Sequence, residues 1–117
     1  MPTVSVIIHT YNNEKFIAET VESVLNQTYK GYEIIVVDDG SVDGTRDALK
    51  PYMQKIRYHY KENGGIASAK NAGIKLSQTE YVAFLDHDDL WVSDKLKLQM
   101  ECFSENPQVG LVYAKYT

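Results

Sequence analysis

The sequence has almost no cysteine, no long apolar run and no excess of basic residues. Cys102 is the only cysteine among 117 residues, so no disulfide can form within the chain and a reducing compartment is expected. No apolar run approaches the length of a transmembrane helix, and the first residues show no signal-peptide pattern. These absences predict a chain without a transmembrane segment and with a cytoplasmic location.

The charge balance excludes one large class of partner. Twelve Lys and Arg residues against sixteen Asp and Glu give a net charge of −4, which is opposite to the basic surface that nucleic acid requires. The same balance does not attract a phosphorylated ligand over a distance, so local groups must hold one. A hydrophobic content of 44% suits a single compact domain over residues 1–117.

Strand and helix patterns alternate along the chain. The dense β-branched run at residues 4–9 predicts a strand that is buried on both faces, as in a parallel sheet. Further strands are predicted at residues 32–37, 56–61, 81–85 and 109–113, and helices at 14–26, 44–53, 64–77 and from 93 onward. The alternation predicts an α/β fold with a Rossmann-like, mostly parallel sheet flanked by helices.

Polar clusters follow the predicted strands at the point where each one ends. They are His9-Thr10-Tyr11-Asn12, Asp38-Asp39-Gly40-Ser41, Asn63-Gly64-Gly65 and Asp86-His87-Asp88-Asp89. Parallel strands bring their carboxyl ends to one edge of the sheet, where ligands bind. The sequence therefore predicts a site at that edge.

The last of these clusters places three carboxylates within four positions, at Asp86, Asp88 and Asp89. Two such charges 4 Å apart repel by about 4 kcal/mol at an effective dielectric constant near 20. A shared divalent cation with oxygen ligands would remove this repulsion. The alternative is a solvated turn whose acids cap the helix that follows, and the cluster alone leaves both interpretations open.

Two familiar nucleotide motifs are missing. The predicted turn between His9 and Glu14 contains no glycine, so a pyrophosphate cannot approach its backbone as in a nicotinamide site, and no Walker motif exists. Gly64 and Gly65 instead precede a helix that carries Lys70, a pattern that offers amide donors to an anion. The alternative is a glycine turn before a closely packed helix.

Taken together, the motifs resemble those of family 2 nucleotide-sugar glycosyltransferases with the GT-A fold. The matching pieces are Val4–Asn12, Asp38–Ser41, Asn63–Gly65 through Lys70–Gly73, and Asp86–Asp89, in the order and spacing of that family and over almost the whole chain. The last piece corresponds to the family's Asp-x-Asp motif. The resemblance implies the nucleotide-binding half of a GT-A fold.

The resemblance also implies roles for the residues that bind the nucleotide. Thr10 and Tyr11 would contact the base, with Tyr11 against its face. Asp39 would hydrogen-bond the edge of the base, and Asp38 would support that loop. Lys70 stands where the family more often has arginine, and a lysine offers a point charge in place of a planar fork.

The acids of the Asp-x-Asp motif are implied to act on the diphosphate. Asp86 would contact the ribose or serve as a metal ligand through a bound water, and Asp88 would ligate Mn²⁺ or Mg²⁺. The implied reaction is an inverting transfer of a sugar from a nucleoside-diphosphate sugar, with a UDP-sugar favoured, to a hydroxyl of a glycan or lipid-linked acceptor. Residues 1–117 would be the donor-binding part, truncated before the acceptor-binding half, with the general base beyond Thr117 and a location in the cytoplasm or at the inner face of a membrane.

Two alternatives belong to other functional classes. A haloacid-dehalogenase-type phosphatase also places Asp-x-Asp after an apolar strand, with Asp86 as nucleophile and Asp88 as general acid. Leu90 and the late position of the motif oppose that interpretation. The other alternative is a non-catalytic module that binds a nucleotide with metal but does not turn it over.

Overall fold

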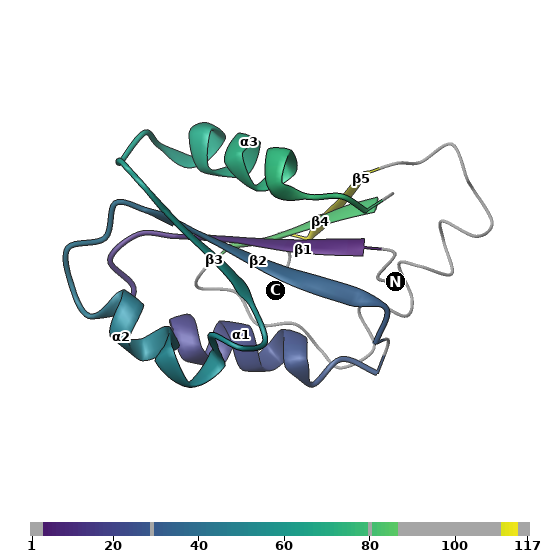
Figure 1. Ribbon diagram of the computed structural model, residues 1–117, viewed down its shortest axis with the longest axis horizontal. Helices are drawn as coiled ribbons and strands as arrows, with labels where there is room; N and C mark the ends of the chain where they lie inside the picture. The colour runs from purple at the N-terminus through teal and green to yellow at the C-terminus, as the bar shows by residue number, and fades with distance from the viewer. Residues whose placement is uncertain (1–3, 29, 80, 87–110, 115–117) are drawn as a thin grey trace.

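The computed structural model describes residues 4–28, 30–79, 81–86 and 111–114. Their strands form one sheet in the order β3(Arg57–Lys61), β2(Tyr32–Asp39), β1(Val4–Thr10), β4(Tyr81–Asp86), β5(Leu111–Ala114). All pairings of these described strands are parallel. The predicted α/β fold with a parallel sheet is confirmed (Figure 1).

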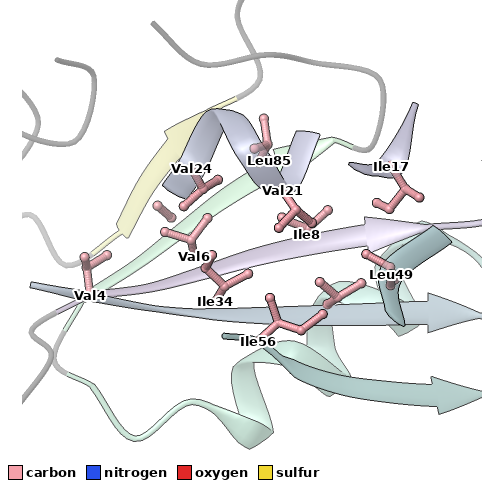
Figure 2. Packing of buried hydrophobic residues seen from close by; sticks show 12 residues of the cluster. Val4, Val6, Ile8, Ile17, Val21, Val24, Ile34, Leu49, Ile56 and Leu85 are labelled. Carbon is pink, nitrogen blue, oxygen red and sulfur yellow. The ribbon is translucent and has the colours of Figure 1, made fainter. Parts of the chain in front are cut away.

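Helices cover both faces of the sheet. α1(Ile17–Leu25) and α2(Thr45–Leu49), followed by the short 3₁₀ helix η1(Lys50–Tyr52), lie on one face, and α3(Ile66–Leu76) lies on the other (Figure 1). Each face has its own buried cluster, because successive residues of a strand point to opposite sides. Val6 and Ile8 of β1 pack in the cluster with α1 (Figure 2), whereas Ile7 packs in the cluster beneath α3. The dense apolar pattern of β1 therefore reflects burial on both faces.

Several predicted boundaries differ from the structure. The predicted helix 14–26 begins only at Ile17, because the carbonyl of Asn13 accepts the N–H groups of both Phe16 and Ile17 in a tight turn. The predicted helix 44–53 divides after Leu49 into α2 and η1, and Pro51 in η1 has no N–H for an α-helical bond. The last predicted strand, 109–113, is observed at 111–114, and the predicted helix after residue 93 lies outside the described residues.

The order of the strands locates the most favourable place for a ligand. From β1 the chain moves outward to β2 and β3, then returns to the other side of β1 to form β4. The direction of winding thus changes between β1 and β4, and ligands of open α/β sheets bind at the carboxyl ends beside such a switch point. Within the part of the chain that the structure describes, no helix has the length and hydropathy needed to span a membrane.

Gly73 sets the distance between α3 and the sheet. A Cβ atom at this position would overlap the Cγ2 atom of Ile7, which is fully buried in β1. An added methyl group must therefore push the helix away from the strand or force Ile7 out of its rotamer.

We predict that Gly73→Ala destabilises the fold although alanine is the better helix former. The helix gains about 1 kcal/mol of propensity, whereas overpacking at Ile7 costs about 1–3 kcal/mol. Urea unfolding should show a net loss of stability, with Asn71→Ala at an exposed position of the same helix as the control. A Gly73→Ala variant as stable as the wild type would contradict the packing described above.

Candidate functional site at the carboxyl edge of the sheet

The adjacent acids Asp38 and Asp39 point to opposite faces of the sheet. Asp38 follows the alternation of Val36, which packs with α1 and α2, and Asp39 follows that of Val37, which packs with α3. The fully buried Asp38 accepts hydrogen bonds from the N–H of Ser41 (2.9 Å) and the hydroxyl of Tyr58 (2.5 Å). Asp38 therefore holds the beginning of the loop that follows β2.

The pKa of Tyr58 depends on its burial and on its hydrogen bond to Asp38. Burial raises the pKa of the Tyr58 phenol, and the hydrogen bond to Asp38 raises that pKa further, to well above its ordinary range. The guanidinium carbon of Arg46 lies 5.7 Å from the centre of the Tyr58 ring. The phenol thus stays protonated at physiological pH and serves Asp38 as a permanent donor.

The loops after β1 and β2 are fastened to each other. The N–H of Asn12 donates to Oγ of Ser41, and the N–H of Val42 donates to Oδ1 of Asn12, both at 2.8 Å. Asn12 has φ of 49°, in the left-handed region that asparagine tolerates better than most residues. A further bond joins the N–H of Asn13 to Oγ1 of Thr45 (3.0 Å). The preceding residue, Tyr11, is left 44% exposed on this fixed loop.

Asp39 fastens the loop between β3 and α3. Its Oδ1 accepts hydrogen bonds from Nζ of Lys61 (3.0 Å) and the N–H of Gly64 (2.9 Å), and its Oδ2 accepts one from the N–H of Gly65 (2.9 Å). The amide of Asn63 donates to the backbone carbonyl of Asp39 (2.9 Å) and lies 3.4 Å from Oδ2. We call these five residues the Asp39 cluster. The anion that the two glycine amides meet in the structure is the carboxylate of Asp39.

The Asp39 cluster also determines the charge of its carboxylate. Burial, with 4% of Asp39 exposed, would raise the pKa of the carboxyl group. Hydrogen bonds from Gly64, Lys61 and Gly65 outweigh this effect and hold the pKa of Asp39 below its ordinary value. Asp39 is therefore ionised at neutral pH and acts only as an acceptor.

Gly40 allows the loops after β2 and β3 to meet. It has φ of +84°, and a Cβ atom there would lie 2.8 Å from the backbone nitrogen of Asn63. A side chain at this position would separate the Asn63 loop from Asp39. The glycine in the Asp38–Ser41 motif is thus required by a close approach as well as by its backbone conformation.

The strand ends bring the other predicted residues to the same edge. The register pairs Thr10 with Asp38 and His9 with Asp86, so the backbone of Asp86 lies across the switch point from β1. Within the described residues, Oγ1 of Thr10 is the one buried side-chain atom without a hydrogen-bond partner. A buried hydroxyl left in this state costs about 1–3 kcal/mol, and such atoms occur where a function or an ordered water accounts for them.

The remaining predicted residues are only partly placed. Nζ of Lys70 on α3 lies 5.2 Å from the centre of the Phe84 ring, which puts the charge over β4. Asp88 and the side chain of Asp86 lie outside what the structure describes. Among the described residues, no three His, Cys, Asp or Glu side chains converge as metal ligands. The metal site therefore stays a prediction, as do the nucleotide contacts of Thr10, Tyr11, Asp38, Asp39 and Lys70.

Comparison with known proteins shows to which family the chain belongs. The family model described as "Glycosyl transferase family 2" matches residues 5–117. The chain belongs to this family. The glycosyltransferase resemblance is thereby confirmed, and the phosphatase interpretation loses its basis.

Relatives of the chain are named as glycosyltransferases. A putative teichuronic acid biosynthesis glycosyltransferase, TuaG of Bacillus subtilis, is 47% identical over 89% of this chain and 43% of its own length. The Escherichia coli protein WfaP, a UDP-Glc:alpha-D-GlcNAc-diphosphoundecaprenol beta-1,3-glucosyltransferase, is 42% identical over 99% of this chain and 47% of its own length. Across these and other curated relatives, the chain spans between 15 and 47% of the length of the matched protein.

Solved structures that are similar to this chain agree with the fold. S. aureus TarS matches with a TM-score of 0.82 and 33% identity, over 92% of this chain and 20% of that protein. Its 1–349 fragment in complex with UDP-GlcNAc matches with a TM-score of 0.79 over 90% of this chain and 33% of the fragment. The mannosyltransferase PcManGT from Pyrobaculum calidifontis, in complex with GDP-Man and Mn²⁺, matches with a TM-score of 0.78 and 29% identity, over 88% of this chain and 32% of its own. The GT-A fold is confirmed.

Two residues of this candidate site could not be found from the motifs. Lys61 and Tyr58 received no role from the sequence, yet they bind Asp39 and Asp38 directly. One signal was present, because Lys61 closes its predicted strand at the same edge as the acids. The pairing with Asp39 becomes visible only with the register between β2 and β3.

We predict that Asp39→Asn removes a stabilisation that depends on pH. Because the pKa of Asp39 is lower in the folded state than in the unfolded state, its carboxylate stabilises the fold fully above the unfolded-state pKa of about 3.9. This stabilisation is lost as the pH falls through the folded-state pKa. The variant should lose about 3 kcal/mol at pH 7, as expected for a broken buried pair. The difference from the wild type should shrink only as the pH falls below about 3.9 toward the lowered folded-state pKa, where the native carboxyl group also becomes neutral.

The measurement is the free energy of unfolding in urea between pH 7 and about pH 2.5, a range that extends below the ordinary pKa of an aspartate. Asp47→Asn serves as the control, since Asp47 forms an exposed pair with Lys50 and should matter by less than about 0.5 kcal/mol. A loss in Asp39→Asn that does not vary with pH would show that the charge of Asp39 is not what stabilises the loop.

Proposed function

We propose that residues 1–117 are the donor-binding part of an inverting, metal-dependent glycosyltransferase that uses a nucleoside-diphosphate sugar. The observation that carries the proposal is that the exposed Tyr11 and the ionised Asp39 both lie at the carboxyl edge, beside the switch point, where hydrogen bonds hold the loops. Family membership and the match to TarS with bound UDP-GlcNAc support the same conclusion.

The base would be bound by an aromatic face and a carboxylate. Tyr11 presents a ring for stacking, and Asp39 is an acceptor for an N–H on the edge of the base. The solved neighbours hold UDP-GlcNAc and GDP-Man, whose bases both offer a ring N–H. We infer a donor of this kind, with a UDP-sugar as the first candidate, and assign base contacts to Thr10 and loop support to Asp38.

The diphosphate would lie toward the end of β4. The backbone of Asp86 is opposite His9 at the switch point, and Asp88 follows two residues later. Carboxylate oxygens suit Mn²⁺ or Mg²⁺, so Asp88 and Asp86 would hold the ion, as a Mn²⁺-containing neighbour also suggests. When bound, the ion supplies charge stabilisation for the departing nucleoside diphosphate. Lys70 adds a positive charge on the α3 side of β4.

Transfer itself requires groups outside this region. An inverting displacement needs a carboxylate that takes the proton of the acceptor hydroxyl, and we place this base beyond Thr117, in the acceptor-binding half. WfaP is named for a diphosphoundecaprenol-linked acceptor, which supports a lipid-linked acceptor or a glycan here as well. Such an acceptor would place the protein in the cytoplasm at the inner face of a membrane, in polysaccharide biosynthesis.

We predict that UDP binds and that Mn²⁺ strengthens the binding. Calorimetric titration with Mn²⁺ should give an affinity at least about tenfold higher than with a chelator, because the ion neutralises the diphosphate. Asp88→Ala should remove this dependence on metal, and Asp47→Ala, at an exposed acid on α2, should retain it. Binding that ignores both Mn²⁺ and Asp88 would show that the metal assignment is wrong.

We predict separately that Tyr11→Ala weakens UDP but not inorganic pyrophosphate. A stacked base contributes about 1–3 kcal/mol, so UDP affinity should fall about tenfold. Tyr11→Phe keeps the ring and should bind normally. Phe16→Ala is the matched control, since Phe16 is exposed (51%) in the same loop. Equal losses for UDP and pyrophosphate would show that Tyr11 does not contact the base.

If the protein carrying this region binds UDP but transfers no sugar, the non-catalytic module is the better description.

A further inference from the structure

Lys61 is a half-buried cation at a site whose ligand is expected to be recognised by an anion. It is the last residue of β3 and pairs in register with Asp39, and its Nζ lies 3.0 Å from Oδ1 of that residue. The two side chains are only 19% and 6% exposed. Nζ also donates to the carbonyl of Glu62 at 2.6 Å. The ammonium group is therefore held in place on two sides.

We propose that Lys61 is a positioning residue for base recognition, holding the carboxylate of Asp39 ionised and oriented so that it can only accept a hydrogen bond from the base. The proposal rests on the proposed nucleotide-binding function and specifies the class of base. Uracil, thymine and guanine carry a ring N–H that such a carboxylate can bind. Cytosine and adenine present a ring nitrogen acceptor in the corresponding position, which an ionised carboxylate repels.

The hydrogen bonds of the Asp39 cluster leave one acceptor position for the ligand. A carboxylate oxygen can accept two hydrogen bonds, and Oδ1 already has Lys61 and Gly64 at 3.0 and 2.9 Å. Oδ2 has one good donor, Gly65, because Asn63 directs its shorter bond to the backbone carbonyl and stays 3.4 Å from Oδ2. That distance exceeds the usual 2.7–3.2 Å of an N–H···O bond. Oδ2 is the atom on which a base N–H would be bound.

Burial explains why the lysine is needed. Asp39 is 4% exposed, and a carboxylate taken out of water tends to protonate unless a positive charge and donors compensate. Once protonated, the group would carry a donor and could pair with cytosine. In a variant without the ammonium group, burial raises the pKa of Asp39 against weaker opposition, so the neutral form gains as the pH falls.

Other charged groups lie near the Asp39 cluster and must be kept constant. His9 on β1 and His59 on β3 share the sheet face of Asp39 by alternation, Lys70 lies on α3 and Glu62 adjoins Lys61. Each of these groups can influence the binding of a nucleotide at this edge. A comparison between variants at position 61 cancels their contribution because every variant retains them.

The experiment is calorimetric titration of UDP and CDP between pH 6 and pH 9 for the wild type, Lys61→Met and Lys61→Arg. Lys61→Met should bind UDP about tenfold more weakly at pH 6, as expected for loss of a charged hydrogen bond, and recover as the pH rises. Its preference for UDP over CDP should fall about tenfold at pH 6. Lys61→Arg should retain the affinity and the preference of the wild type, and Lys50→Met, in an exposed pair, should change neither.

The outcomes separate this inference from the proposed function. If the wild type binds UDP while Lys61→Met keeps the pH profile and the UDP preference of Lys61→Arg, the role of Lys61 is overturned. If the wild type binds no nucleoside diphosphate, the proposed function falls and this inference falls with it. Should Lys61→Met not fold, Lys61→Gln keeps a neutral donor and is expected to show the same pH-dependent loss. A Lys61→Gln variant with wild-type behaviour would also overturn the inference.

Discussion

The structure depends on the burial of β1 on both faces and between two parallel neighbours. Every residue from Val4 to Thr10 is buried, so a polar group along this strand must find its partners inside the protein. Ser5 does so near the start of the strand, where its hydroxyl donates to Glu33 at 2.5 Å. Groups that are to meet a ligand can lie only where the strand ends, and Tyr11 is the first residue beyond it to be exposed.

Because both faces of the sheet are covered, the adjacent acids Asp38 and Asp39 of β2 have different partners. Because side chains alternate along β2, Asp38 and Asp39 cannot serve the same loop. Asp38 binds the loop that follows its own strand, and Asp39 binds the loop that follows β3. A shift of one residue in the pairing of β2 would exchange the two acids and disconnect both loops. The paired acids of this motif are thus a consequence of sheet geometry, and each is defined by the face to which it points.

The sequence allowed the sheet and its functional edge to be predicted because periodicity and strand-end polarity are local features. The residue at which α2 ends could not be predicted, since Pro51 interrupts an otherwise helical pattern but does not show which earlier residue is the last of the helix. Side-chain contacts between neighbouring strands could not be predicted either, because the pairing of Asp39 with Lys61 depends on the register of β2 and β3. The amides of Gly64 and Gly65 were expected to be open toward an anion, whereas in the structure both donate to Asp39, a partner that follows from the folding of the loop. Asp88 lies outside the described residues and remains a prediction.

A buried ion pair contributes little to stability compared with apolar residues of the same size, so the Asp39–Lys61 pair calls for another explanation. The pair is supported by two backbone amides from a loop whose glycine conformation at Gly65, with φ of +93°, is open to few other residues. Such an arrangement fixes the direction of the carboxylate before any ligand arrives, which lowers the entropy that binding must overcome. Folding energy is thus used to hold one acceptor in place. A fixed acceptor at the same edge of the sheet as an exposed aromatic ring suits recognition of a flat, hydrogen-bonding base.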